Sequence, residues 1–221
     1  MLDKADAYIQ KIHDIDAELD LDELPQLRFQ LDTHFSLVEY YRDKGMDEMA
    51  DEHVKKTGYV TEDTWMVLGP FDNADGIGYD TAYIPEGITE IDLSVKYDGV
   101  DGPIRWKKFT DAELDGYIHL GEQPVDWQVS YAFATINAPD EREVQFRFDS
   151  DDQGKVWLNG REVFSHTKAF MAIVDTYTIP VKLKPGRNSI LVKVCNERGG
   201  WGFFLRITNE DGQPFDDLII N

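Results

Sequence analysis

The hydrophobic residues of the chain follow two different spacings, which divide it into an N-terminal helical part and a longer β part. In the first part they recur every three or four positions, the period of one helix face. The two stripes are Tyr8, Ile12, Ile15 and Leu19, and then Leu27, Leu31, Phe35 and Val38. Pro25 separates them, and Gly45 precedes a third short helix over 46–54. The pattern predicts helices within residues 4–56.

Beyond Thr64 the hydrophobic residues alternate with polar ones or form short β-branched and aromatic runs, as strands do. Candidate strands are 65–68, 91–97, 104–109, 117–120, 127–136, 144–148, 155–158, 161–164, 171–183, 189–194, 201–207 and 218–220. Turn residues connect them over short distances. This arrangement predicts an antiparallel sandwich or jelly roll and disfavours a parallel α/β sheet.

The strongest local signal is Asn159–Gly160, which lies between two of these runs. A type I′ turn needs positive φ at both central residues, and Asn-Gly meets that need best. We therefore expect a tight hairpin at this pair.

Two stretches around this hairpin resemble known β modules. Residues 155–160 (KVWLNG), followed later by 181–196 (VKLKPGRNSILVKVCN), resemble the galactose-binding-like jelly roll, in particular the sugar-binding domain of family 2 glycoside hydrolases. Residues 146–163 (FRFDSDDQGKVWLNGREV) resemble the aspartate-bearing strand and loop of protective-antigen-type lectin domains. The resemblance implies an all-β jelly-roll sandwich (galactose-binding-like) with an N-terminal α-helical segment, divided into 1–60 and 61–221. Most such modules are not catalysts.

The helical segment is similar, over residues 41–50 (YRDKGMDEMA), to a tetratricopeptide repeat. Only one unit is visible, whereas at least three are usually needed for stability. Either this is the last unit of a longer array, or the helices pack on the sandwich. In both cases the segment is a scaffold, and other domains of a longer chain are expected partners.

Charge narrows the set of partners. The 43 acidic and 22 basic side chains give a net charge of −21, which repels nucleic acid and anionic membranes and favours cations. The alternative is that the acidic side chains keep the protein soluble or adapt it to a saline medium. The sequence contains no run of about 20 apolar residues, which is the length that a membrane-spanning helix needs. The first residues of the sequence do not show the pattern of an export signal. The single Cys195 rules out an intramolecular disulfide but leaves the compartment open. From the resemblance we expect a secreted, periplasmic or cell-surface parent protein.

Calcium is the cation that the acidic loops suit best, because it takes hard oxygen ligands on flexible loops. The first acidic group is Asp72, Asn73, Asp75 and Asp80; the second is Asp149, Asp151 and Asp152. The lectin resemblance implies that an adjacent pair, here Asp151–Asp152, holds calcium and through it a sugar. The alternative is that these are turn residues that bond their own backbone.

Signals for catalysis are lacking. There is no G-x-S-x-G motif, and the five histidines show no H-x-x-x-H or H-x-H spacing. Glycosidases need two carboxylates at a set distance, but with 43 acidic residues almost any fold would bring some pair to that distance. Such a pair therefore would not indicate a glycosidase. We expect no activity in this chain itself.

Sugars stack on exposed aromatic rings while charged and amide groups bond their hydroxyls. Trp106 and Trp127 have polar neighbours and are the candidate platforms, although core filling is the alternative for each. Arg198 lies in a polar loop from which it could reach a ligand. The sequence therefore predicts a non-catalytic carbohydrate-binding or accessory module. The alternatives are a structural or protein-interaction sandwich, and an ancillary domain of a polysaccharide-degrading enzyme whose catalytic domain lies elsewhere.

Overall fold

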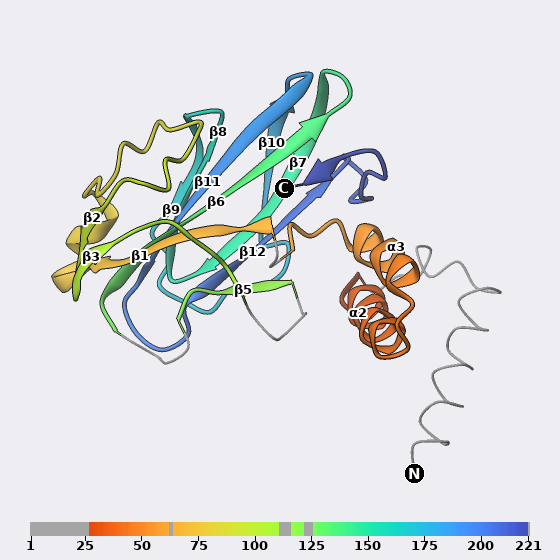
Figure 1. Ribbon diagram of the computed structural model, residues 1–221, viewed down its shortest axis with the longest axis horizontal. Helices are drawn as coiled ribbons and strands as arrows, with labels where there is room; N and C mark the ends of the chain where they lie inside the picture. The colour runs from red at the N-terminus through yellow and green to blue at the C-terminus, as the bar shows by residue number, and fades with distance from the viewer. Residues whose placement is uncertain (1–26, 62–63, 111–115, 122–125, 221) are drawn as a thin grey trace, which may run out of the picture. The chain divides into compact units, whose positions relative to one another are not determined.

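The computed structural model describes residues 27–61, 64–110, 116–121 and 126–220 (Figure 1). It comprises two compact units, the first ending at Gly58 and the second beginning at Tyr59. None of the described helices is long and apolar enough to cross a membrane.

The first unit contains two helices that pack against each other, α2 (Leu27–Asp43) and α3 (Asp47–Thr57). Gly58 ends α3 with a φ of 73°, where a residue without Cβ avoids strain. The predicted helix that contains Tyr8 and Leu19 lies outside the described residues. The similarity to a tetratricopeptide repeat stays a prediction.

The second unit is built from antiparallel sheets, which confirms the predicted β-sandwich architecture; the jelly-roll connectivity stays a prediction. The larger sheet has the order β4-β1-β6-β11-β8-β9, with β13 also paired to β6. Its strands are β1 (Met66–Asp72), β4 (Lys107–Lys108), β6 (Gln128–Ala138), β8 (Gln153–Leu158), β9 (Arg161–His166), β11 (Gly186–Asn196) and β13 (Ile219–Ile220). The smaller sheet has the order β10-β7-β12-β5. Its strands are β5 (Tyr117–His119), β7 (Arg142–Asp151), β10 (Tyr177–Leu183) and β12 (Gly202–Thr208).

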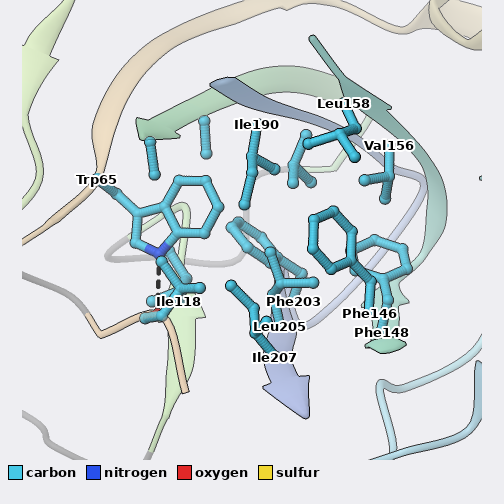
Figure 2. Packing of buried hydrophobic residues seen from close by; sticks show 14 of the residues in the cluster. Trp65, Ile118, Phe146, Phe148, Val156, Leu158, Ile190, Phe203, Leu205 and Ile207 are labelled. Atoms are coloured by element: carbon cyan, nitrogen blue, oxygen red, sulfur yellow. Dashed lines mark hydrogen bonds between the residues drawn. The ribbon is translucent and has the colours of Figure 1, made fainter. Parts of the chain in front are cut away.

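The main hydrophobic core lies between these two sheets (Figure 2). Alternate residues of each strand point into it, as the period of two requires. Phe146 and Phe148 of β7 and Phe203 of β12 face Val156 of β8 across the interior, and all four are fully buried. Trp65 closes one side of the core and donates its indole N–H to the carbonyl of Val60 at 3.0 Å.

A second hydrophobic cluster covers the opposite face of the larger sheet. The covering segment includes the short helix η3 (Ala74–Tyr79) and the two-stranded sheet β2 (Tyr97–Gly99) and β3 (Gly102–Ile104). Its apolar side chains pack on residues of β1, β6 and β11. The outer face of the larger sheet is therefore covered by the chain itself over β1, β11 and the first part of β6.

A charge pair between Lys193 and Glu86 holds the covering segment on the larger sheet. Lys193 of β11 is fully buried, and its ammonium donates to the carbonyls of Tyr79 and Thr81 and, at 2.8 Å, to Glu86 Oε1. The hydroxyl of Tyr131 donates to the same carboxylate oxygen at 2.7 Å. These four hydrogen bonds give the buried lysine and the partly exposed glutamate their partners.

Three strand predictions are wrong in detail. The predicted strand over 104–109 is interrupted at Arg105 and Trp106, between the end of β3 at Ile104 and β4 (Lys107–Lys108). Residues 91–96 form turns and irregular chain, and pairing begins only at Tyr97. The predicted strand over 171–183 begins only at Tyr177. Its first part belongs to a loop over 167–176, because Asp175 adopts a positive φ of 60° and Thr176 bonds the carbonyl of Ile173.

The predicted hairpin at Asn159–Gly160 is confirmed. The two residues have φ values of 52° and 77°, and β8 pairs antiparallel with β9. Asn159 also donates from its side chain to Asn188 Oδ1 at 2.9 Å, and Asn188 in turn donates to the carbonyls of Lys184 and Gly186. The two amides join the hairpin to the turn before β11.

Candidate functional site

The ends of several strands gather at one end of the sandwich and bring separate loops together. Asp72 of β1, Gln128 of β6 and Asn196 of β11 are paired in one row of the larger sheet. Asp151, the last residue of β7, pairs with Gly202, the first of β12. We call the group formed here by Trp127, Asp151, Asp152, Glu197 and Arg198 the end site.

Hydrogen bonds hold these loops to one another. Asp152 Oδ2 accepts the backbone N–H groups of Glu197 at 2.8 Å and Arg198 at 3.3 Å. Trp127 N donates to the carbonyl of Glu197 at 3.1 Å, and Gly199 N donates to Asp126 Oδ1. Four of the five predicted ligand-binding residues, all except Trp106, therefore belong to one connected set of loops.

The end site combines an aromatic ring, an exposed cation and carboxylates. Trp127 is half-buried and Arg198 is exposed, whereas Asp152 is buried beneath the loop. This mixture of a π-face with charged hydrogen-bonding groups is the kind that polar, ring-shaped ligands such as sugars require.

Asp151 is the electrostatically strained member of the end site. Burial and the neighbouring negative charges of Asp152 and Asp149 raise its pKa to about 6, and Lys168 opposes them. The peptide bond between Asp151 and Asp152 is cis. A cation beside the two carboxylates would relieve this repulsion.

The loop over 167–176 adjoins the end site through Asp149. This fully buried carboxylate accepts Lys168 Nζ and the backbone N–H of Ile173, both at 2.9 Å. The loop exposes Phe170 and Met171 to solvent. Sequence reasoning missed it because its apolar residues resembled the start of a strand.

A buried serine and histidine lie nearby without the arrangement for nucleophilic catalysis. Ser150 Oγ is 2.9 Å from His166 Nε2 and donates its proton to the carbonyl of Asp152. His166 Nδ1 accepts the N–H of Lys168, so the ring carries its proton on Nε2 and donates to the serine. The histidine therefore faces Ser150 as a donor and not as a base.

Trp106 is a correction to the sequence analysis. Its side chain is only 4% exposed and packs in the second hydrophobic cluster, with its ring against Phe133. Lys107 and Lys108, whose polarity suggested exposure, form the edge strand β4 and are themselves exposed. Trp106 lies between the exposed Arg105 and Lys107 with its ring buried, so it offers no stacking surface.

The acidic loop Asp72, Asp75 and Asp80 has a local structural use. All three side chains are exposed, and Asp72 Oδ1 accepts the N–H of Ala74 at 3.0 Å, as a turn residue does. Asp75 adopts a positive φ of 56° inside η3. Among the described residues, no group of three or more His, Cys, Asp or Glu side chains is placed to hold a metal ion.

Calcium fits the Asp151–Asp152 pair only in part. The two carboxylates interact with each other, but Asp149 is occupied by Lys168 and Ile173, and one oxygen of Asp152 is bonded to backbone N–H groups. Because calcium takes six to eight oxygens, the other ligands of an ion here would have to be carbonyls, a sugar or water.

Comparison with known proteins gave weak structural neighbours. No family model matches the sequence, and no curated protein matches it either. An anti-sigma factor domain-containing protein from Clostridium clariflavum aligns at 13% identity and a TM-score of 0.36, over 51% of this chain and 42% of its own. A β-glucosidase from Kluyveromyces marxianus in complex with glucose aligns at 13% identity and a TM-score of 0.35, over 60% and 18%.

A β-glucuronidase from Ruminococcus gnavus aligns at 22% identity and a TM-score of 0.29, over 62% of this chain and 20% of its own. The chain spans less than half the length of each of these three proteins. At such TM-scores the superpositions do not establish a common fold.

Proposed function

We propose that the β-sandwich unit is a non-catalytic carbohydrate-binding or accessory module of a larger secreted or surface protein, and that the end site binds the glycan. The observation that carries this proposal is the convergence of Trp127, Arg198, Asp151 and Asp152 from separate loops. The resemblance of residues 146–163 to lectin modules supports it. The jelly-roll connectivity belongs to the same proposal.

In this proposal Trp127 stacks on a sugar ring, and Arg198 donates to its hydroxyl groups. Calcium bound by Asp151 and Asp152 would lower their mutual repulsion and bring the sugar's hydroxyl oxygens to the pair. The glycosidic bond is left intact.

The test is glycan-array binding by the full chain, with calcium and with chelator, followed by calorimetry on the best ligand. Trp127→Ala should weaken binding about tenfold, which corresponds to the loss of one stacked ring, with an unchanged unfolding midpoint. Ile219→Ala is the control, because Ile219 is exposed and pairs with Asn137 near the far end of β6. Calcium should raise the affinity and the unfolding midpoint of the wild type, and neither in Asp151→Asn.

A second candidate is a structural or protein-interaction sandwich. The exposed Phe170, Met171 and Ile173 favour it, because clustered apolar side chains in solvent mark interaction sites. Absence of glycan binding in both conditions would leave this role and overturn the lectin proposal.

A further inference from the structure

The end site is held from two sides by two buried side chains, Asp152 and Asn73. Asp152 holds the segment after β11 from the side of the smaller sheet. On the other side Asn73, which is fully buried, holds Asn196, the last residue of β11. The two side chains enclose residues 196–198.

Asn73 contacts three separate parts of the chain. Its side-chain amide donates from Nδ2 to the carbonyl of Asn196 at 2.9 Å, and its Oδ1 accepts the N–H of Gly78 at 2.9 Å. Its own backbone N–H donates to the carbonyl of Trp127 at 2.9 Å. An amide carries both a donor and an acceptor, so one side chain satisfies a carbonyl on one loop and an N–H on another.

The position of Asn73 in the sheet explains its reach. It follows the last residue of β1, and the order β1-β6-β11 places β6 between it and its partner Asn196. The side chain therefore passes the beginning of β6, where Trp127 precedes Gln128. Trp127, just before β6, and Asn196, the last residue of β11, are both bonded to this single residue.

The loop after Asn73 packs closely against the side-chain amide of Asn73. A Cβ on Gly78 would lie 2.4 Å from Val129 and 2.6 Å from Asn73 Oδ1, so only glycine allows the loop to close on the amide. Gly76 N donates to the carbonyl of Asn73 at 2.8 Å. The loop from Asn73 to Gly78 thus closes around the buried side-chain amide of Asn73.

We infer that Asn73 is a positioning residue of the end site, which sets the placement of Trp127 and of residues 196–198 relative to one another. This inference rests on the proposed function of the site for its consequence in binding, but the coupling of the three segments is independent of any ligand. Asn73 would not touch the glycan; its side chain acts through the carbonyl of Asn196, while its backbone N–H bonds the carbonyl of Trp127.

Hydrogen exchange of the full chain without ligand tests the coupling. Asn73→Ala keeps the backbone N–H that bonds Trp127 but removes both side-chain bonds. It should speed exchange at Gly78, which loses its acceptor, at Glu197, which follows the released Asn196, and at Trp127, whose N–H donates to the carbonyl of Glu197. Asn73→Asp keeps the acceptor for Gly78 but loses the donor to Asn196. It should therefore free the segment after β11 and leave Gly78 protected. Exchange that changes only within 73–80 in both variants would overturn the inference.

A matched control separates positioning from general stability. Asn188 is also a fully buried amide that joins two turns, but it lies near the opposite end of β11. Asn188→Ala should lower stability while leaving exchange at Trp127 and Glu197, and glycan affinity, unchanged. Asn73→Ala should weaken the best glycan about tenfold. Equal weakening by both variants would contradict a positioning role.

The two proposals fail in different ways. If the wild type binds no glycan, the proposed function falls, while the exchange result still decides the coupling. If the wild type binds glycan and the Asn73 variants bind equally well with protected Trp127 and Glu197, the positioning role falls alone.

Discussion

At the residue scale, the titrating groups near the end site act on stability in opposite directions. Asp151 has a pKa raised to about 6 by burial and by the charges of Asp152 and Asp149. His166 has its pKa lowered, chiefly by burial. The folded state therefore favours the uncharged form of both residues.

The sign for Asp151 follows from linkage. Between its unfolded pKa, about 4, and about 6, the folded chain holds the proton more firmly, so this residue's contribution to stability falls as pH rises through that window. We expect Asp151→Asn, in calcium-free buffer, to be more stable than wild type by about 1 kcal/mol at pH 7.5, because solvent screens a partly exposed group. The gain should vanish near pH 4.

Urea unfolding of both proteins at the two pH values measures this difference, with His166→Gln as the comparison. His166 contributes in the opposite sense: its stabilising effect is complete above its unfolded pKa of about 6.5 and is lost as pH falls toward its lower folded pKa. An Asp151→Asn advantage that does not depend on pH would contradict the raised pKa.

At the element scale, the sequence predicted what depends on neighbours along the chain and missed what depends on contacts across it. The hairpin at Asn159–Gly160 followed from turn chemistry, and the alternation in β7 and β12 predicted the core. The sequence left the burial of Trp106 open, because the chain around it is irregular and carries no periodic signal. Asn73 was placed in an acidic turn, since its partner Asn196 is 123 positions away.

The link between two turns is a testable element-scale feature. Asn188 makes four side-chain hydrogen bonds, to Asn159, Lys184 and Gly186. Asn188→Ala leaves these groups without hydrogen-bond partners and should lower the free energy of unfolding by about 2–3 kcal/mol. A double-mutant cycle with Asn159→Ala, measured by urea unfolding, should give a coupling energy of about 1 kcal/mol. Additive effects would mean that the two amides act independently.

At the scale of the β-sandwich unit, the covered outer face of the larger sheet restricts where a ligand can bind. Lys193, Glu86 and Tyr131 fasten the covering segment to that face. At the end of the sandwich Trp127 is half-buried and Arg198 is exposed, and neither belongs to the hydrophobic clusters formed by the described residues.

Removing one partner of the charge pair tests how firmly the cover is held. Lys193→Met leaves Glu86 without its cation and should lower the free energy of unfolding by about 3 kcal/mol. The double variant Lys193→Met/Glu86→Gln should recover part of that loss, because no unpaired charge remains. Denaturant unfolding of the three proteins gives the values, and a single variant as stable as wild type would refute the fastening role.

The cover over the larger sheet also has a consequence for the geometry of recognition. A flat open face would accept a long polymer lying along it. The loops of the end site, in contrast, can contact only a short part of a polymer, such as its end. Under the proposed function, the terminal units and branch tips of a polysaccharide suit this module better than the middle of an extended fibre.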